Sequence, residues 1–186
     1  DIDGEAAGDR SGWSVSMNSA GDRVAIGAIN NDATDSNAGH VRVYQLNNDV
    51  WTQIGGDIDG EAAGDSSGRS VSMNSVGDRV AIGAIYGDAT GISNAGHVRV
   101  YQRDTNATTG WTQIGADIDG EAIQDESGCS VSLNATGDRV AIGAPLNDAT
   151  GSGAGHVRVY QLATNATLDW QQIAADIDDE VATHNS

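Results

Sequence analysis

Acidic residues recur at fixed positions along this chain, and their types and spacing could bind a metal ion. Alternate-position carboxylates followed by a glycine resemble the start of a calcium loop, because Ca²⁺ takes about six to eight oxygen ligands. The full spacing of an EF-hand is absent, since the later Asp or Asn and the closing Glu are missing. Two interpretations stay open: a divalent cation site with Ca²⁺ as the cofactor, or a solvated acidic turn that pairs with arginines of a neighbouring repeat. The candidate ligands are Asp1, Asp3, Glu5, Asp9, Asp57, Asp59, Glu61, Asp65, Asp117, Asp119, Glu121 and Asp125.

Three histidines could also bind a metal, but their spacing argues against a shared site. His40, His97 and His156 each follow a glycine at the same place in a sequence repeat. Equivalent residues of separate repeats cannot converge on one ion unless they line a central channel, so we expect each to pack within its own repeat. The single cysteine, Cys129, aligns with a tryptophan and an arginine in the other repeats. No nucleophile elbow or phosphate loop is present, and we predict neither catalytic residues nor an enzyme.

The tripeptide Asn-Ala-Thr occurs three times and matches the acceptor pattern for N-glycosylation. Two copies fall in equivalent loops and the third falls in a tight turn, all of which suit a surface modification. The predicted glycosylation sites of a secreted eukaryotic protein are therefore Asn106, Asn134 and Asn165, whereas in a bacterium the motif would carry no such meaning.

The composition excludes several classes of protein. The chain has 186 residues with nine arginines, no lysine and 27 acidic residues, which gives a net charge of −18. A nucleic-acid binder needs a basic face, and an anionic membrane surface would repel this chain. No apolar run approaches the roughly 20 residues of a membrane span, so we expect no membrane insertion. Patterned valine, isoleucine and alanine indicate a folded, acidic, β-rich protein rather than a disordered one.

Three repeated strings set the organisation. The string DIDGEA begins at residues 1, 57 and 117, and a diverged copy, DIDDEV, begins at residue 176. The strings GDRVAIGA and GHVRVYQ each occur three times, once after each copy of DIDGEA. We expect the arginines of both strings to pair with the acidic turns. The predicted units are repeat 1 over 1–56, repeat 2 over 57–116, repeat 3 over 117–175, and the start of a fourth repeat over 176–186.

Each repeat is predicted to form four short antiparallel strands, over 13–17, 22–28, 40–45 and 51–55 in the first repeat. Both faces of the second strand are apolar or very small, which predicts burial on both sides. We expect the first two strands to be enclosed and the last two to be half exposed. A four-stranded unit of this length fits a β-propeller blade. Three blades do not close a ring, so the fold class is all-β, an open segment of a larger propeller or a ring completed by an oligomer.

The residues Ser11–Ser16, Val24–Ala28 and Gly39–Tyr44 resemble the FG-GAP repeat, the blade unit of integrin α-chain propellers and of many surface proteins. The third repeat is the most similar, since Ala141–Pro145 matches the "GAP" part. The resemblance implies an extracellular, non-catalytic propeller used for adhesion or scaffolding. The family's calcium loop is not carried over, because the turn over 18–22 is too short and has too few carboxylates.

The function predicted from these features is an extracellular or cell-surface structural and adhesive module. It would mediate protein–protein, matrix or filament assembly, with calcium support left open. Its expected partners are other repeats or copies of the same protein that complete the ring or filament, and no nucleic acid. The alternative is a carbohydrate-binding, lectin-like propeller that uses glycans as partners. Equivalent tryptophans at 51, 111 and 170 could supply its aromatic platforms, although rim-strand packing explains them as well.

Overall fold

The computed structural model describes residues 1–89, 91–104, 106, 110–163 and 168–178. This described part consists of β-strands and turns, without helices, in agreement with the predicted all-β class. The strands are β1 Ser11–Met17, β2 Arg23–Ala28, β3 His40–Asn47, β4 Val50–Gln53, β5 Ile58–Asp59, β6 Ser70–Met73, β7 Arg79–Ala84, β8 His97–Arg103, β9 Trp111–Gln113, β10 Ile118–Asp119, β11 Ser130–Leu133, β12 Arg139–Ala144, β13 His156–Leu162, β14 Trp170–Gln172 and β15 Ile177–Asp178.

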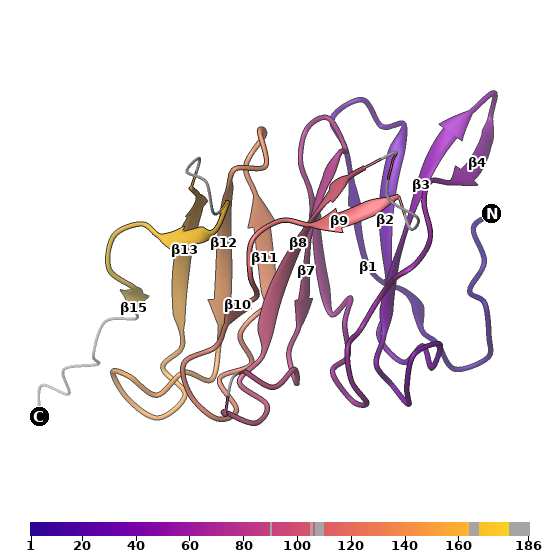
Figure 1. Ribbon diagram of the computed structural model, residues 1–186. Helices are drawn as coiled ribbons and strands as arrows, with labels where there is room; N and C mark the ends of the chain where they lie inside the picture. The colour runs from indigo at the N-terminus through magenta and orange to yellow at the C-terminus, as the bar shows by residue number, and fades with distance from the viewer. Residues whose placement is uncertain (90, 105, 107–109, 164–167, 179–186) are drawn as a thin grey trace, which may run out of the picture.

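The strands form three antiparallel sheets of the same design, which stand side by side (Figure 1). Four strands follow one another in chain order in each sheet, as in β1-β2-β3-β4. A fifth strand of two residues, β5, β10 or β15, pairs with the start of the third strand. These are propeller-like blades, as predicted, and the three described sheets do not close into a ring.

A tight turn between the first two strands of each sheet is built by one asparagine and one glycine. In the first sheet the Oδ1 atom of Asn18 accepts the backbone N–H groups of Asp22 at 3.1 Å and Arg23 at 2.9 Å. Gly21 has a φ of 73°, which glycine adopts at little cost. Because the side chain replaces backbone partners, this short turn needs no bound ion.

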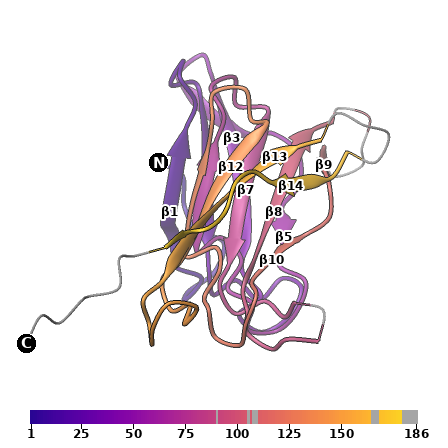
Figure 2. The same ribbon diagram turned by 90° about the vertical axis from the view of Figure 1, so that its left-hand side faces the viewer.

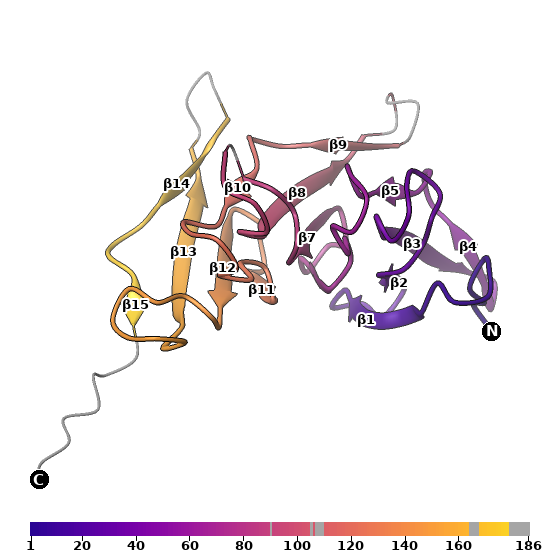
Figure 3. The same ribbon diagram turned by 90° about the horizontal axis from the view of Figure 1, so that it is seen from below.

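The three sheets fan out from their first strands (Figure 3). Along the inner side the first strand β6 contacts β1 of the preceding sheet and β11 of the following sheet, whereas β4, β9 and β14 lie on the outer side. A view from the side of the third sheet shows the sheets one behind another (Figure 2). Strand one of each sheet therefore lies on the inner side of the fan and strand four at its rim, as in a propeller blade.

The hydrophobic cores lie between neighbouring sheets. Strand β7 contributes Val80 and Ile82 to the core with the first sheet and Ala81 to the core with the third sheet. This arrangement confirms the prediction that the second strand is buried on both sides. The prediction of half-exposed third strands was wrong for β3 and β8, whose central valines are buried, because a connector strand and the neighbouring sheet cover them.

The prediction of an enclosed first strand was wrong for β1. Its Trp13, Val15 and Met17 are 44, 64 and 54% exposed. In the second and third sheets the equivalent strands pack against a preceding sheet, but no described sheet precedes β1. The burial of this strand therefore depends on its neighbours rather than on its own residue pattern.

Candidate functional site

A two-residue strand brings acidic connectors and histidines together. Ile58 of β5 pairs with Val41 of β3, and Asp59 pairs with His40. Ile58 is buried, which anchors the connector against the first sheet. Since alternate residues of a strand share a face, Asp57 and Asp59 lie on the same side as His40. A connector assigned to the second repeat thus completes the sheet of the first.

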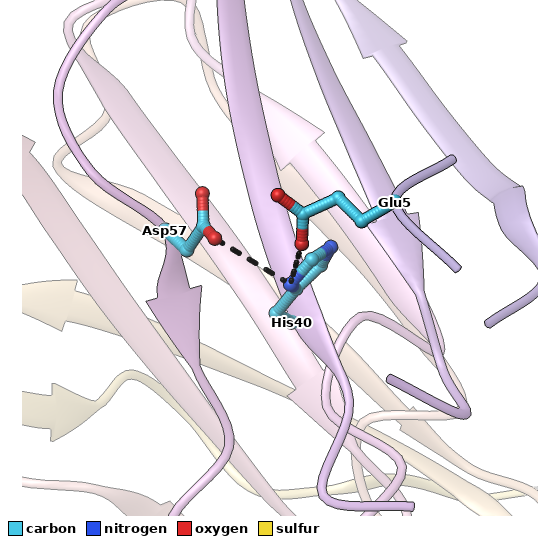
Figure 4. A group of neighbouring side chains, drawn as sticks. All are labelled: Glu5, His40 and Asp57. Atoms are coloured by element: carbon cyan, nitrogen blue, oxygen red, sulfur yellow. Dashed lines mark ion pairs between the residues drawn. The ribbon is translucent and has the colours of Figure 1, made fainter. Parts of the chain in front are cut away.

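The first cluster consists of Glu5, His40 and Asp57 (Figure 4). The Nδ1 atom of His40 lies 3.8 Å from Oε2 of Glu5 and 3.9 Å from Oδ2 of Asp57. His40 is buried at 1% exposure, whereas the side chains of Glu5 and Asp57 are 43 and 27% exposed. A buried imidazole therefore lies between two carboxylates that solvent can reach.

The same cluster recurs in the other two sheets. In each copy the Glu and the His come from one repeat and the Asp comes from the connector that follows. The candidate ligand atoms of each cluster lie within 4.8 Å of one another. The described residues thus contain the clusters Glu5–His40–Asp57, Glu61–His97–Asp117 and Glu121–His156–Asp176.

Each carboxylate of the first cluster has one oxygen held by an outer partner. The Oε1 atom of Glu5 lies 3.5 Å from Nη1 of Arg42. The Oδ1 atom of Asp57 accepts a hydrogen bond of 2.7 Å from Nε2 of Gln53. The remaining oxygens, Oε2 and Oδ2, face the imidazole of His40. The outer partners thereby orient both carboxylates.

These outer partners are repeated with the clusters. Arg99 and Arg158 lie 3.1 Å from Glu61 and Glu121, and glutamines donate to Asp117 and Asp176 in the same way as in the first cluster. Each of these arginines also donates to a connector carbonyl, at 2.7–3.1 Å. The expected pairing of HVRVY arginines with acidic connectors is therefore present in all three sheets.

Burial shifts the pKa of two titratable groups at the first cluster, His40 and the adjacent Asp59. Burial lowers the pKa of His40 below its ordinary value of 6.5, and the neighbouring Asp57 and Glu5 oppose this shift. Burial, together with the nearby Asp57 carboxylate, raises the pKa of Asp59. The imidazole is therefore neutral at neutral pH, beside an excess of negative charge.

The four carboxylates of each connector do not gather in one loop. The first Asp reaches the histidine of the preceding sheet, and the Glu reaches the histidine and arginine of its own sheet. The fourth carboxylate is buried in a turn, where Asp9 accepts the N–H of Ala6 and the side-chain amide of Asn31. Asp65 and Asp125 are placed in the same way, each accepting a backbone N–H three residues earlier.

The histidines lie in separate sheets and do not converge on one another, as expected. Sequence reasoning missed their carboxylate neighbours, because only the pairing of β5 with β3 brings Asp57 to His40. The arginines of GDRVAIGA were predicted to pair with acidic turns, and this was wrong where the next sheet is present. Arg23 and Arg79 donate to the carbonyls of Gly77 and Gly137, because they lie at the junction between sheets.

The remaining predicted sites have structural surroundings of their own. The side-chain amide of Asn134 donates to Asp138 and its Oδ1 accepts two backbone N–H groups, as Asn18 does in its turn. Asn106 is exposed, and Asn165 lies outside the described residues. Trp111 and Trp170 are buried and donate their Nε1–H to carbonyls of the preceding sheet. These two indole rings pack between sheets at the rim, so they are not exposed as a platform for a glycan would have to be.

The three repeated sheets and their connectors define a propeller-like repeat protein. Residues 3–44, which span the first sheet up to β3, match the FG-GAP repeat family. The predicted FG-GAP resemblance is thus confirmed for the first repeat, the part of the chain that matches. A search of curated protein sequences finds no match.

One solved structure is similar in fold, and a second gives a weaker match. The first, from Bacteroides uniformis, is named as a 6-phosphogluconolactonase, with a TM-score of 0.58 at 10% identity. The match covers 90% of this chain and 41% of that one, so this chain spans less than half of its length. The second, from Sulfolobus tokodaii, is named as a hypothetical selenium-binding protein, with a TM-score of 0.49 at 10% identity over 84% of this chain and 38% of that one. In the described residues there is no helix of the length and hydropathy required to cross a bilayer.

Proposed function

We propose that this chain is a non-catalytic, extracellular structural module whose two outer sheet faces each receive a further blade of the same kind. The FG-GAP match over residues 3–44 supports a repeat module, since such repeats are typically extracellular and structural. The assembly role is inferred from a set of contacts that both internal junctions share. At each end of the described part only one side of such a junction is present, without the sheet that would contact it.

The two junctions between sheets use the same hydrogen bonds. At the first junction, Ser14 Oγ donates to the carbonyl of Gly68 at 2.7 Å, and Ser16 Oγ accepts the N–H of Met73 at 2.9 Å. At the second, Ser70 and Ser72 make the equivalent bonds to Gly128 and Leu133. The junction is therefore a repeated interface with a fixed register.

Close backbone approach adds to this interface. A Cβ atom on Gly27 would lie 2.3 Å from the carbonyl oxygen of Gly68, and one on Gly83 would lie 2.1 Å from that of Gly128. A Cβ on Gly143 would meet only Ser130 of its own sheet. The third sheet therefore has the glycine that permits close approach at the other junctions, but no described sheet lies against it.

Apolar residues that are buried at the internal junctions are exposed on the outer face of the third sheet. Val157 is 37% exposed, whereas the equivalent Val41 and Val98 are 0% exposed. Ile177 is 60% exposed, whereas the equivalent Ile118 is 4% exposed. A surface hollow on this face is lined by residues that include Ser130, Gly143, Val157 and Ile177.

The first sheet presents the complementary half. Gly12 and Met17 are equivalent to the Gly68 and Met73 that bond to a preceding sheet, and the exposed Val15 belongs to the same strand. The two ends differ from each other, so they would join head to tail in a heterologous contact. The occupant of each end is thus a blade of this kind, which a second copy supplies when the chain is alone.

Light scattering over a concentration series tests this proposal. We expect the molar mass to rise above the 19.0 kDa of one chain as concentration rises. Gly143→Val places a side chain on the open face and should shift the mass to that of one chain. Ile123→Glu, at an exposed connector position away from this face, is the control and should still associate. A single-chain mass at all concentrations, or equal association of both variants, would contradict the proposal.

A further inference from the structure

We propose that each of the three Glu–His–Asp clusters binds a divalent transition-metal ion of the zinc type, and that this ion ties one connector to the next across a sheet. This inference is independent of how the end faces associate. It assigns a nitrogen-containing site that differs from a calcium loop made of connector carboxylates alone.

The first support comes from the buried imidazoles. His40, His97 and His156 are 1, 2 and 5% exposed. Among the described residues, Nδ1 of each has no hydrogen-bond partner, and neither does Nε2 of His97 or His156. A buried polar atom without a partner costs about 1–3 kcal/mol. A metal ion bound to Nδ1 would give this buried nitrogen the partner that it lacks within the protein.

The distances in the clusters fit a shared ion better than direct hydrogen bonds. Nδ1 of His40 lies 3.8 and 3.9 Å from its two carboxylate oxygens, and Nδ1 of His156 lies 3.6 Å from Oδ2 of Asp176. Hydrogen bonds require about 2.7–3.2 Å. Two ligands of a tetrahedral zinc ion with bonds of about 2.1 Å lie about 3.4 Å apart. Small side-chain movements would therefore close the site around an ion.

The outer partners support a ligand role for the inward oxygens. Arg42 holds one oxygen of Glu5, and Gln53 holds one oxygen of Asp57, while the other oxygen of each faces His40. Metal-ligating carboxylates are commonly fixed in this manner by a second layer of hydrogen bonds. Equivalent arginine and glutamine partners accompany the other two clusters.

The charges and the ligand types select the ion. Glu5 and Asp57 bring two carboxylates to the cluster, and their combined charge matches that of a divalent ion. Imidazole with two carboxylates is a set that zinc and similar ions accept. Ca²⁺ prefers about six to eight oxygen ligands and gains little from a nitrogen. Partial exposure of Glu5 and Asp57 leaves a path for entry.

Calorimetric titration of Zn²⁺ into chelator-treated chain at neutral pH tests the assignment. We expect three ions per chain. Asp57→Asn should remove one of them, because it replaces a ligand oxygen at a partly exposed position where refolding is not at risk. Asp1→Asn is the matched control: it makes the same change at the equivalent connector position, which no described histidine strand precedes. This control should retain all three ions.

A second variant and a spectroscopic readout protect the test from folding defects. His40→Gln should also lose one ion, and circular dichroism should confirm that both variants keep the strand spectrum. Co²⁺ substitution should give visible bands that weaken by about a third in each variant. Equal ion counts in Asp57→Asn and Asp1→Asn would overturn the proposal. Loss of binding only when Cys129 is blocked, or heat with Ca²⁺ but none with Zn²⁺, would also overturn it.

Discussion

At the scale of single residues, the arginines of the third strands organise the clusters. Arg99 contacts Glu61 and a connector carbonyl, and its guanidinium lies 5.8 Å from the ring centre of Tyr101. Arg158 has the same relation to Tyr160 at 5.6 Å. One buried side chain thus links an acidic connector, a strand and an aromatic ring, which a lysine could not do with the same geometry.

The partly buried Tyr101 and the buried Tyr160 predict a loss of stability at alkaline pH. Burial raises the pKa of Tyr101 and of Tyr160 above 10.0, although the neighbouring arginines oppose the shift. A pKa that is raised in the folded state gives stability that is complete below the unfolded value and is lost as pH rises through the folded value. We expect the free energy of unfolding to fall as the pH rises past about 10, the ordinary pKa of a tyrosine.

Chemical denaturation across that pH range measures this effect. The double variant Tyr101→Phe/Tyr160→Phe should lose less stability than the parent chain as the pH rises. Tyr86→Phe, at a position that is 45% exposed, is the control. Parallel alkaline slopes in the parent and the double variant would count against a role for these two phenols.

At the scale of elements, the short connector strands explain how adjacent sheets are joined. Strand β5 covers the start of β3 with the buried Ile58. The backbone carbonyl of Asp59, at the end of β5, accepts a hydrogen bond from Arg99 of the second sheet. Strand β10 repeats this relation between the second and third sheets. Two residues of pairing therefore position the whole following unit, because their partners lie on both sides of the junction.

Glycine substitution at the junctions should reveal the close approach of the sheets. Gly83→Ala places a Cβ 2.1 Å from a backbone oxygen, and backbone cannot rotate away. We expect a destabilisation of about 1–3 kcal/mol or more, as overpacking usually costs. Gly143→Ala meets only the hydroxyl of Ser130, which can rotate, and should cost less. Urea unfolding of dilute protein compares the two, and equal losses would disagree with a junction at Gly83.

At the scale of the whole molecule, the fold is an open arc with a strong negative charge. The 27 acidic and nine basic residues give −18, and the connectors place many of these charges at equivalent points of successive sheets. Such repulsion destabilises a compact state and is reduced by salt, since the Debye length is about 10 Å at 0.1 M.

Salt should therefore stabilise this protein. We expect the melting midpoint to rise between about 0.02 M and about 0.5 M sodium chloride, by about 2–4 °C for each kcal/mol of repulsion removed. A chelator should be present, so that bound ions do not contribute. Choline chloride at equal ionic strength is the control and should give the same rise. An unchanged midpoint would argue that the repeated acidic surface has no net cost.

Features that depend on local pattern could be predicted from the amino-acid sequence. The repeated strings predicted three equivalent units, and their alternation and small residues predicted short strands with a doubly buried second strand. Asparagine and glycine marked the tight turn over 18–21, because turn geometry depends on a few adjacent residues. The FG-GAP resemblance followed from the same strings and is confirmed over 3–44.

The contacts between residues that are distant in the sequence could not be predicted in this way, because they depend on how the sheets pack. The pairing of Ile58 with Val41 sets Asp57 beside His40, and no local pattern states the register of that pairing. The exposure of Val15 and Val157 likewise depends on whether another sheet lies against them, not on their own strands. Local periodicity specifies an element and its faces, whereas contacts across sheets depend on the free energy of the whole assembled core.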